Sequence, residues 1–246
     1  MPNALMPSRC HLLLPAAGSG RRMAAERPKQ YLSVAGKTLL QHTLERLALL
    51  PLAERITLVL AAGDPWWPEV AAGLPLALRR RLQCVDGGAE RAASVLQGLE
   101  ALQSHVQAGD FVLVHDAVRP CVAQDDILRL MESLEHEPAG GLLASPLRDT
   151  LKRVDAAGYV VSTADRRGLW SAATPQMFRY GVLLEALRAA QRAGVMVTDE
   201  AQAVEQLGHR VLVVAGRADN IKVTFPEDLP LVERLLQGGA DATADR

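Results

Sequence analysis

Residues 12–32 place small residues and cations directly after an apolar run, in the order LLLPAAGSGRRMAAERPKQYL. Four residues after the run have minimal side chains: Ala16, Ala17, Gly18 and Gly20. Backbone N–H groups can approach a phosphate chain closely there, and Arg21 or Arg22, then Lys29, follow within reach. A nucleoside triphosphate carries about four negative charges, more than N–H dipoles alone would pair. The spacing therefore favours a triphosphate loop over a strand-to-helix turn with solvated charges.

This loop completes neither of the familiar glycine motifs. A dinucleotide fingerprint needs a third glycine three residues after Gly20, and Met23 stands there. A P-loop needs Gly-Lys-Ser/Thr five residues after its first glycine. The chain offers GKT at 36–38, but Tyr31 occupies the place of that first glycine. We interpret the GKT as a turn before a helix.

The segment VHDAVRP (114–120) ends an apolar run with an acid and a base. Asp116 lies where a carboxylate could hold Mg²⁺ or accept from a substrate hydroxyl, and Arg119 could bind an anion. The structural alternative is that Asp116 caps the next helix or pairs locally with Arg119.

Two further segments combine glycine turns or cations with a helix start. In DGGAERAASVLQGL (86–99), Gly88 lets the backbone come close to a ligand and Ser94 could reach a base edge. The alternative is a tight turn. In GRADNIKVTFPEDL (216–229), Lys222 is either a phosphate ligand or an exposed lysine. No histidine has metal-ligand spacing, and no Ser-His-Asp set or nucleophile elbow is present, so a covalent mechanism has no candidate.

The composition limits the class of protein. The chain has 246 residues, 49% apolar and 22% charged, with a net charge of −1, so any positive potential must be local. Three cysteines without a CxxC motif are typical of reduced thiols. The first ten residues lack the basic region of a signal peptide, and no apolar run approaches the roughly 20 residues of a membrane span. We expect a cytoplasmic protein with no nucleic-acid or membrane partner.

Short apolar runs alternate with amphipathic segments along the chain. Strands are predicted at 10–16, 55–62, 81–87, 110–117, 141–146 and 209–216. Helices are predicted at 38–50, 89–104, 124–136, 179–193, 199–207 and 226–237. This alternation indicates an α/β fold with a mostly parallel sheet covered on both faces. Ligands bind at the carboxyl ends of such strands, which makes the loops 16–30, 86–94 and 115–120 the candidate site.

The segment 149–170 interrupts this alternation with two short β-prone runs around DAAG, a plausible hairpin turn. An isolated hairpin is marginally stable in water, so it should pack on something, most simply a second copy of the chain. We expect one domain over 1–237, with a β-arm at about 147–172, and a disordered tail at 238–246.

Seven motifs together resemble one family: PAAGSGRRM…RPKQYL, GGAERAASV, HDAVRP, RDTLKR, DRRGLWSAATPQMF, TDEA and NIKVTFPEDL. Their order and spacing are similar to those of 2-C-methyl-D-erythritol 4-phosphate cytidylyltransferases of the non-mevalonate isoprenoid pathway, over about residues 10–237. The resemblance implies a Rossmann-like nucleotidyltransferase fold whose protruding β-arm builds a homodimer. It also implies transfer of a cytidylyl group from CTP to the sugar-alcohol phosphate, with Mg²⁺ as cofactor.

The resemblance also implies roles for particular residues. Cytidine and triphosphate contacts fall on Ala16, Ala17, Gly18, Gly20, Gly88, Ser94 and Ala117. The implied catalytic residues are Arg22, Lys29, Arg166 and Lys222. Arg22 and Lys29 would be the cations on the transition-state phosphates. A pocket for the acceptor's phosphate would be formed by Thr150, Thr174, Arg166 and Lys222, with Arg166 coming from the partner's arm. Asp116 and Arg119 fall near the acceptor and the metal. Ala89 stands where other members often have a polar residue, so any base contact there must use the backbone.

Two other functions are consistent with much of this sequence. A cytidylyltransferase for another polyol phosphate, such as ribitol 5-phosphate, has most of the same motifs. The segments DRRGLW and TPQ favour methylerythritol phosphate over such an acceptor only modestly. A non-catalytic nucleotide-binding regulator would need no second phosphate pocket, so the four cationic residues above argue against it. The sequence leaves open whether Arg21 or Arg22 faces the phosphates.

Overall fold

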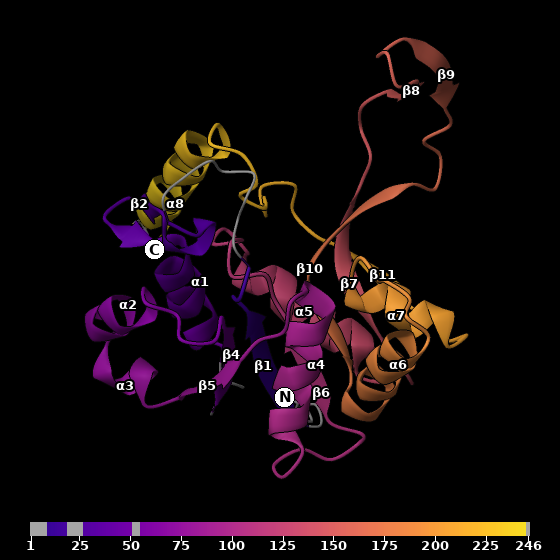
Figure 1. The fold of residues 1–246 in the computed structure, drawn as a ribbon. Coiled ribbons are helices and arrows are strands. Elements are labelled where there is room, and N and C mark those ends of the chain that lie inside the picture. Colours follow the sequence, from indigo (N-terminus) through magenta and orange to yellow (C-terminus); the bar gives the residue numbers. More distant parts are fainter. Residues whose placement is uncertain (1–8, 19–26, 51–54, 245–246) are drawn as a thin grey trace, which may run out of the picture.

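A seven-stranded sheet forms the centre of the protein in a computed structural model that describes residues 9–18, 27–50 and 55–244 (Figure 1). In spatial order the strands are β11 (Leu212–Ala215), β7 (Gly140–Pro146), β10 (Trp170–Arg179), β6 (Phe111–Val114), β1 (Cys10–Pro15), β4 (Ile56–Leu60) and β5 (Leu82–Asp86). β10 is antiparallel to both of its neighbours, and the other pairs are parallel. The predicted α/β fold with a mostly parallel sheet is confirmed.

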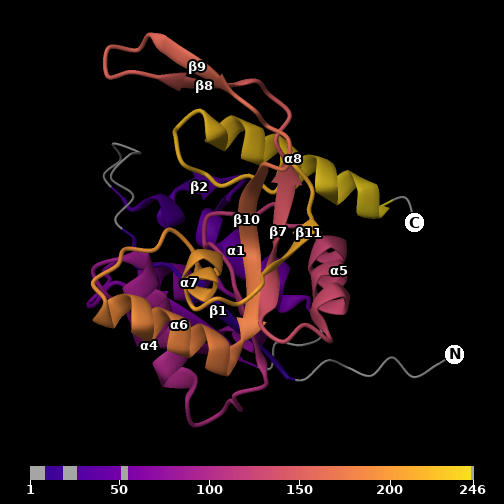
Figure 2. The same ribbon diagram turned by 90° about the vertical axis from the view of Figure 1, so that its right-hand side faces the viewer.

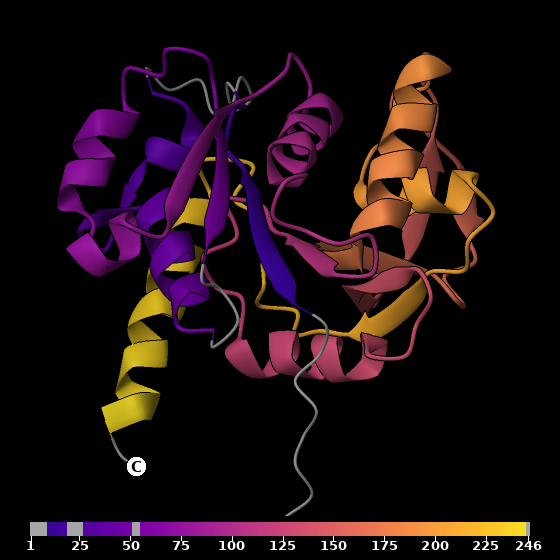
Figure 3. The same cartoon turned by 90° about the horizontal axis from the view of Figure 1, so that it is seen from below.

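Helices cover both faces of this sheet, because the strands are apolar on both sides. Leu12 and Leu14 of β1 pack on one face against α1 (Leu39–Ala48), α2 (Trp67–Gly73), α3 (Leu76–Arg79) and α5 (Gln124–Leu134). Leu13 points the other way, toward α4 (Arg91–Leu102), α6 (Tyr180–Arg192) and α7 (Glu200–Gln206). Figure 3 shows α4 and α6 above the sheet and α5 below it. Each fully buried leucine contributes about 2 kcal/mol, so this double core holds the strand ends rigidly.

The last helix, α8 (Asp228–Ala244), packs against the small hairpin of β2 (Ser33–Val34) and β3 (Lys37–Thr38) through a third apolar cluster. It includes residues 238–244, which we expected in a tail and which begin with two glycines, poor helix formers. Residues 221–225 were expected to be strand-like but are irregular. Within the described ranges, no helix is both long and apolar enough to cross a membrane.

The GKT segment lies directly before a helix, as predicted, although only Gly36 is in the turn. Lys37 and Thr38 form β3, and the Thr38 side chain accepts from the Gln41 N–H in a capping box that begins α1. Lys37 Nζ lies 2.6 Å from Glu45 Oε2 on the surface. The motif that most resembles a nucleotide-binding sequence therefore starts a helix.

A two-stranded arm extends from the body between β7 and β10 (Figures 1 and 2). β8 (Leu151–Val154) pairs with β9 (Val160–Ala164), and the DAAG turn closes on Asp155 Oδ1, which accepts from two backbone N–H groups. Gly158 there has a φ of +88°, a conformation that glycine adopts without strain. The hairpin is where we predicted it. The strand that follows, β10, was missed, because it leaves the arm and enters the main sheet.

Candidate active site

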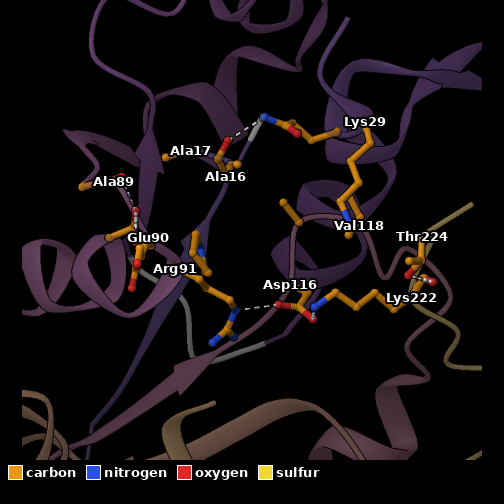
Figure 4. A pocket seen from close by; sticks show the side chains of 16 residues that line it. Ala16, Ala17, Lys29, Ala89, Glu90, Arg91, Asp116, Val118, Lys222 and Thr224 are labelled. Carbon is orange, nitrogen blue, oxygen red and sulfur yellow. Dashed lines mark hydrogen bonds and ion pairs between the residues drawn. The ribbon is translucent and has the colours of Figure 1, made fainter. Parts of the chain in front are cut away.

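A cavity of about 500 Å³ opens at the carboxyl ends of β1, β5 and β6 (Figure 4). All three predicted loops contribute to its wall. The lining residues are Pro15, Ala16, Ala17, Gly18, Lys29, Gln30, Gly88, Ala89, Glu90, Arg91, Ser94, Asp116, Ala117, Val118, Lys222 and Thr224. The position at one edge of a parallel sheet is the one that open α/β folds use for ligands.

The loop after β1 presents small residues to the cavity. The Ala16 N–H donates to the Val59 carbonyl at 2.7 Å, and the Ala16 carbonyl accepts from Gln30 Nε2 at 2.7 Å. These two bonds hold the start of the loop. Among the described residues, nothing lies within 4 Å of where a Cβ on Gly18 would be. Within the part of the chain that the structure describes, Gly18 therefore leaves open space on the cavity wall.

The loop after β5 is tightly packed at its two glycines. A Cβ on Gly87 would lie 2.6 Å from Ala17 Cβ, and one on Gly88 would lie 2.6 Å from Ala93 Cβ. The Ser94 hydroxyl donates back to the Glu90 carbonyl at 3.0 Å. With its proton used in this way, the oxygen of Ser94, which lines the cavity, remains available only as an acceptor.

Asp116 forms the negative centre of the cavity floor. Its Oδ1 lies 3.1 Å from Arg91 Nε, and its Oδ2 lies 3.2 Å from Arg119 Nε and 3.0 Å from Lys222 Nζ. Figure 4 shows Arg91 and Lys222 reaching it from opposite sides. Burial would raise the pKa of Asp116, but Arg91, Lys222 and Arg119 outweigh it and hold that pKa far below its usual range. Asp116 stays ionised and fixes three cations.

A buried hydrogen-bond chain supports Asp116 from behind. The Asp116 N–H donates to Thr174 Oγ1 at 3.0 Å, and Thr174 Oγ1 lies 3.1 Å from His115 Nδ1. His115 Nε2 lies 3.0 Å from the Arg119 carbonyl, which can only accept, so Nε2 carries the proton and the Thr174 hydroxyl donates to Nδ1. Burial lowers the pKa of His115 to about 4, which keeps the ring neutral.

Lys29 faces Asp116 across the cavity (Figure 4). It begins a short 3-10 turn, η2 (Lys29–Tyr31), and its Nζ donates to the Val223 carbonyl at 3.2 Å. Val223 is also tied to the Asp116 loop, because its N–H donates to the Val118 carbonyl at 3.0 Å. Lys29 is therefore an ordered cation on the cavity wall.

A second cavity, of about 310 Å³, lies beside the first. Lys222 lines both, and Arg119 lines the second. The other lining residues include Ser145, Ser171, Arg217 and Asn220. Two polyanions bound in these cavities would meet at Lys222. Within the described ranges, no group of three or more His, Cys, Asp or Glu side chains is placed to hold a metal ion.

The model of the 2-C-methyl-D-erythritol 4-phosphate cytidylyltransferase family matches residues 10–238. The chain belongs to this family. It is 52% identical over 226 residues to the enzyme of that name from Ectopseudomonas mendocina, covering 91% of this chain and 94% of that one. The Vibrio cholerae enzyme is 51% identical over 221 residues, covering 90% and 93%. This chain is accordingly a cytidylyltransferase, an enzyme.

Solved structures of family members share the fold. A 4-diphosphocytidyl-2C-methyl-D-erythritol synthase aligns with a TM-score of 0.81 and 35% identity, covering 94% of this chain and all of that one. The cytidylyltransferase from Francisella tularensis aligns with a TM-score of 0.79 and 33% identity, covering 93% and 100%. These structures support the same overall fold for this chain.

The structure brings most of the predicted site residues to the first cavity: Ala16, Ala17, Gly18, Lys29, Gly88, Ser94, Asp116, Ala117 and Lys222. Arg119 lines the second cavity. Thr174 was expected in the acceptor pocket, but its hydroxyl is buried in the chain behind Asp116. Thr150 and Arg166 are exposed on the arm, and Gly20 and Arg22 lie outside the described residues.

Two charged residues of this cytidylyltransferase were missed. Arg91 was placed only on the first helical turn after the glycine turn, and Glu200, in the TDEA motif, was given no role. The two side chains form a bidentate ion pair at 2.6 and 3.0 Å although 109 residues separate them. Both stand in motifs that we quoted, but only the folded sheet brings α4 and α7 together.

Proposed function

We propose that this enzyme transfers the cytidylyl group of CTP to 2-C-methyl-D-erythritol 4-phosphate and releases pyrophosphate. The observation that carries the proposal is the pair of neighbouring cavities with Lys222 between them. A triphosphate in the first cavity and a phosphate monoester in the second would meet there. Family membership over residues 10–238 supports the same substrates.

The chemistry needs positioning rather than a catalytic base. A phosphate monoester has a second pKa near 6, so the acceptor is largely a dianion at pH 7 and can attack without losing a proton. Its oxygen forms a bond to the α-phosphorus of CTP, and the bond from that phosphorus to the bridging oxygen of pyrophosphate breaks. The electron pair leaves on pyrophosphate. The obstacle is the approach of two polyanions, which fixed cations overcome.

Lys29 and Lys222 are the described cations suited to that task. Lys29 lies on the wall opposite Asp116, and Lys222 lies where the two cavities meet. In this proposal Lys29 binds the triphosphate and Lys222 binds the phosphates that react. Arg22, in the loop outside the described residues, is proposed as a further triphosphate cation from its place in the motif.

Base selection would involve the loop after β5. The Ser94 oxygen can accept from the exocyclic amino group of cytosine, whereas uracil has a carbonyl there and would find no donor, because the hydroxyl proton is already used. Ala89 lines the cavity with only a methyl group, so any contact at that position comes from its backbone. Ser94→Ala should narrow the preference for CTP over UTP.

Mg²⁺ is proposed as the cofactor. Magnesium commonly binds through one or two carboxylates together with substrate phosphates, and Asp116 is a carboxylate on the cavity floor. Both Asp116 oxygens already face cations of the chain, so triphosphate oxygens would supply most of the ligands and Asp116 would take part through one oxygen at most. When bound, the ion would neutralise phosphate charge. We expect EDTA to abolish turnover and added Mg²⁺ to restore it.

A homodimer would complete the site. Arg166 lies on the exposed arm, and the arm carries exposed apolar side chains, among them Tyr159 at 74%, Val160 at 60% and Val161 at 63%. Contiguous apolar surface of this kind marks interaction sites. We propose that a second copy covers the arm and that each arm brings Thr150 and Arg166 to the partner's acceptor pocket. Val161→Asp should shift the protein toward monomers in analytical ultracentrifugation.

All three cysteines are unpaired, which supports a reducing, cytoplasmic setting. The decisive assay crosses CTP, UTP, ATP and GTP with methylerythritol phosphate and ribitol 5-phosphate, with and without Mg²⁺, and measures pyrophosphate. We expect turnover with CTP and methylerythritol phosphate. Turnover with ribitol 5-phosphate alone would reject this acceptor, and binding of CTP without pyrophosphate would reject catalysis.

A further inference from the structure

Glu200 is a buried carboxylate for which the mechanism above has no use. It is 1% exposed, at the start of α7, and outside both cavity linings. Its two oxygens accept from Arg91 Nη1 at 2.6 Å and Nη2 at 3.0 Å. Burying a carboxylate is costly unless it is well paired. Glu200 is therefore placed to act on Arg91.

The backbone around Glu200 is tied to the main sheet. Gln176 of β10 donates from Nε2 to Asp199 Oδ2 at 3.0 Å and accepts from the Ala201 N–H at 2.9 Å. Asp199 also caps α7 by accepting from the Gln202 N–H at 2.9 Å. These hydrogen bonds fix Asp199 and Ala201, the residues on either side of Glu200. Its carboxylate is therefore held in one place relative to the sheet.

Arg91 divides its donors between two carboxylates. The two terminal nitrogens face Glu200, and only Nε faces Asp116, at 3.1 Å. Because a guanidinium is planar and rigid, the bidentate pair with Glu200 fixes how its edge meets Asp116. Asp116 Oδ2 is then left to Arg119 and Lys222.

The charges of the ion-pair cluster around Asp116 and Glu200 give the loss of Glu200 a second effect. Three cations, Arg91, Arg119 and Lys222, share Asp116 and Glu200, which leaves the cluster one positive charge. Without the Glu200 charge, the terminal nitrogens of Arg91 could turn to Asp116 or into the cavity. Lys222 would then compete with Arg91 for one carboxylate and lose its fixed direction.

We propose that Glu200 is a positioning residue for cytidylyl transfer, which holds Arg91 so that Asp116 can aim Lys222 between the two cavities. The inference rests on the function proposed above. Glu200 touches neither substrate in this proposal. Its loss should reduce the rate of the chemical step more than the binding of CTP, because the remaining cations still attract a triphosphate.

The test compares Glu200→Gln with Glu205→Gln, which removes the same charge from an exposed position on the same helix. For Glu200→Gln we expect kcat to fall about 10- to 100-fold, on the scale of misplacing a catalytic group, with the KM for CTP unchanged or lower. Glu205→Gln should match the wild type. Arg91→Lys should also lower kcat, and the double variant should be no worse than Arg91→Lys alone, because both act through one contact.

Several outcomes would overturn the proposal. One is a kcat of Glu200→Gln equal to that of Glu205→Gln, and another is additive losses in the double variant. A KM increase with unchanged kcat would point to substrate binding instead. If circular dichroism shows that Glu200→Gln does not fold, Glu200→Asp takes its place, since its shorter side chain keeps the charge but displaces Arg91. Absence of turnover in the wild type would reject the proposed function itself, a result separate from any of these.

Discussion

The cavity floor and the arm both carry charged side chains, but they use them differently. At the floor, Asp116 is 7% exposed and touches three cations from three segments of the chain. On the arm, Arg167 pairs with Asp165, two residues away, and the two side chains are 89% and 57% exposed. Coulomb attraction is strong where water is excluded and weak where it is not.

The same contrast holds for apolar residues. The central strands β4 and β6 are buried on both faces, whereas β8 and β9 of the arm form a single exposed layer. A rigid double core can hold charges in fixed positions for catalysis. A bare hairpin can be stabilised only by another surface. The cavity is therefore preorganised within one chain, whereas the arm leaves apolar side chains exposed that the proposed second copy would cover.

Replacing one acid in each region should give the largest difference. Asp116→Ala removes the carboxylate that Arg91, Arg119 and Lys222 share. We expect the free energy of unfolding to fall by about 3 kcal/mol and activity by about 10³-fold. Asp165→Ala on the arm should leave the free energy of unfolding unchanged within error. Urea unfolding followed by circular dichroism measures the free energy of unfolding of both variants, and pyrophosphate release measures their activity. Equal losses in the two variants would contradict the contrast.

Two lysines test the same contrast for cations. Lys29→Ala should lower kcat/KM about 10²-fold or more with the fold intact, the scale of losing one preorganised charge contact. Lys37→Ala, which removes the exposed partner of Glu45, should stay near the wild-type rate. Steady-state release of pyrophosphate distinguishes them. Near-normal turnover of Lys29→Ala would remove Lys29 from the mechanism.

The buried neutral His115 predicts a pH effect that the exposed arm lacks. Its folded-state pKa of about 4 lies below the ordinary 6.5, so the unfolded chain binds a proton that the folded chain refuses. The contribution of neutral His115 to the free energy of unfolding is therefore fully present above pH 6.5. It falls by roughly 3 kcal/mol as the pH drops toward 4. His115→Gln should reduce the dependence of the free energy of unfolding on pH by about one proton, measured by urea unfolding between pH 7 and 4. An unchanged slope would show that His115 is not the group responsible.

Mixing variants from the two regions tests whether they meet across a dimer. Lys29→Ala damages the cavity, and Arg166→Ala damages the arm. A hybrid dimer contains one site with an intact cavity and an intact partner arm, so an equal mixture of two inactive variants should recover at most about a quarter of wild-type activity. No recovery, despite demonstrated subunit exchange, would contradict a shared site.

Local chemistry explains how much of the fold was predictable. Most of the apolar strands and amphipathic helices, and the Asp155 turn, depend on residues close together in the chain and lie within or next to the predicted ranges. The short helices α2 and α3 lie in no predicted range. Thr38 could be expected at a helix start for the same reason. β10 was missed because a strand that joins two distant strands has no local signal of its partners. The helical end of α8 was missed because Gly238 and Gly239 favour the end of a helix there.

The sequence by itself determined the class of fold, the loops that meet at the strand ends and the cations available to a triphosphate. The positions of apolar runs along the chain and the sizes of the residues after them are local properties, so they can be inferred without coordinates. Only the tertiary structure decided which charges pair: that Asp116 is shared by three cations, that Thr174 supports it from behind, and that Glu200 holds Arg91. These contacts depend on the order of strands in the sheet, which brings together side chains up to 109 residues apart.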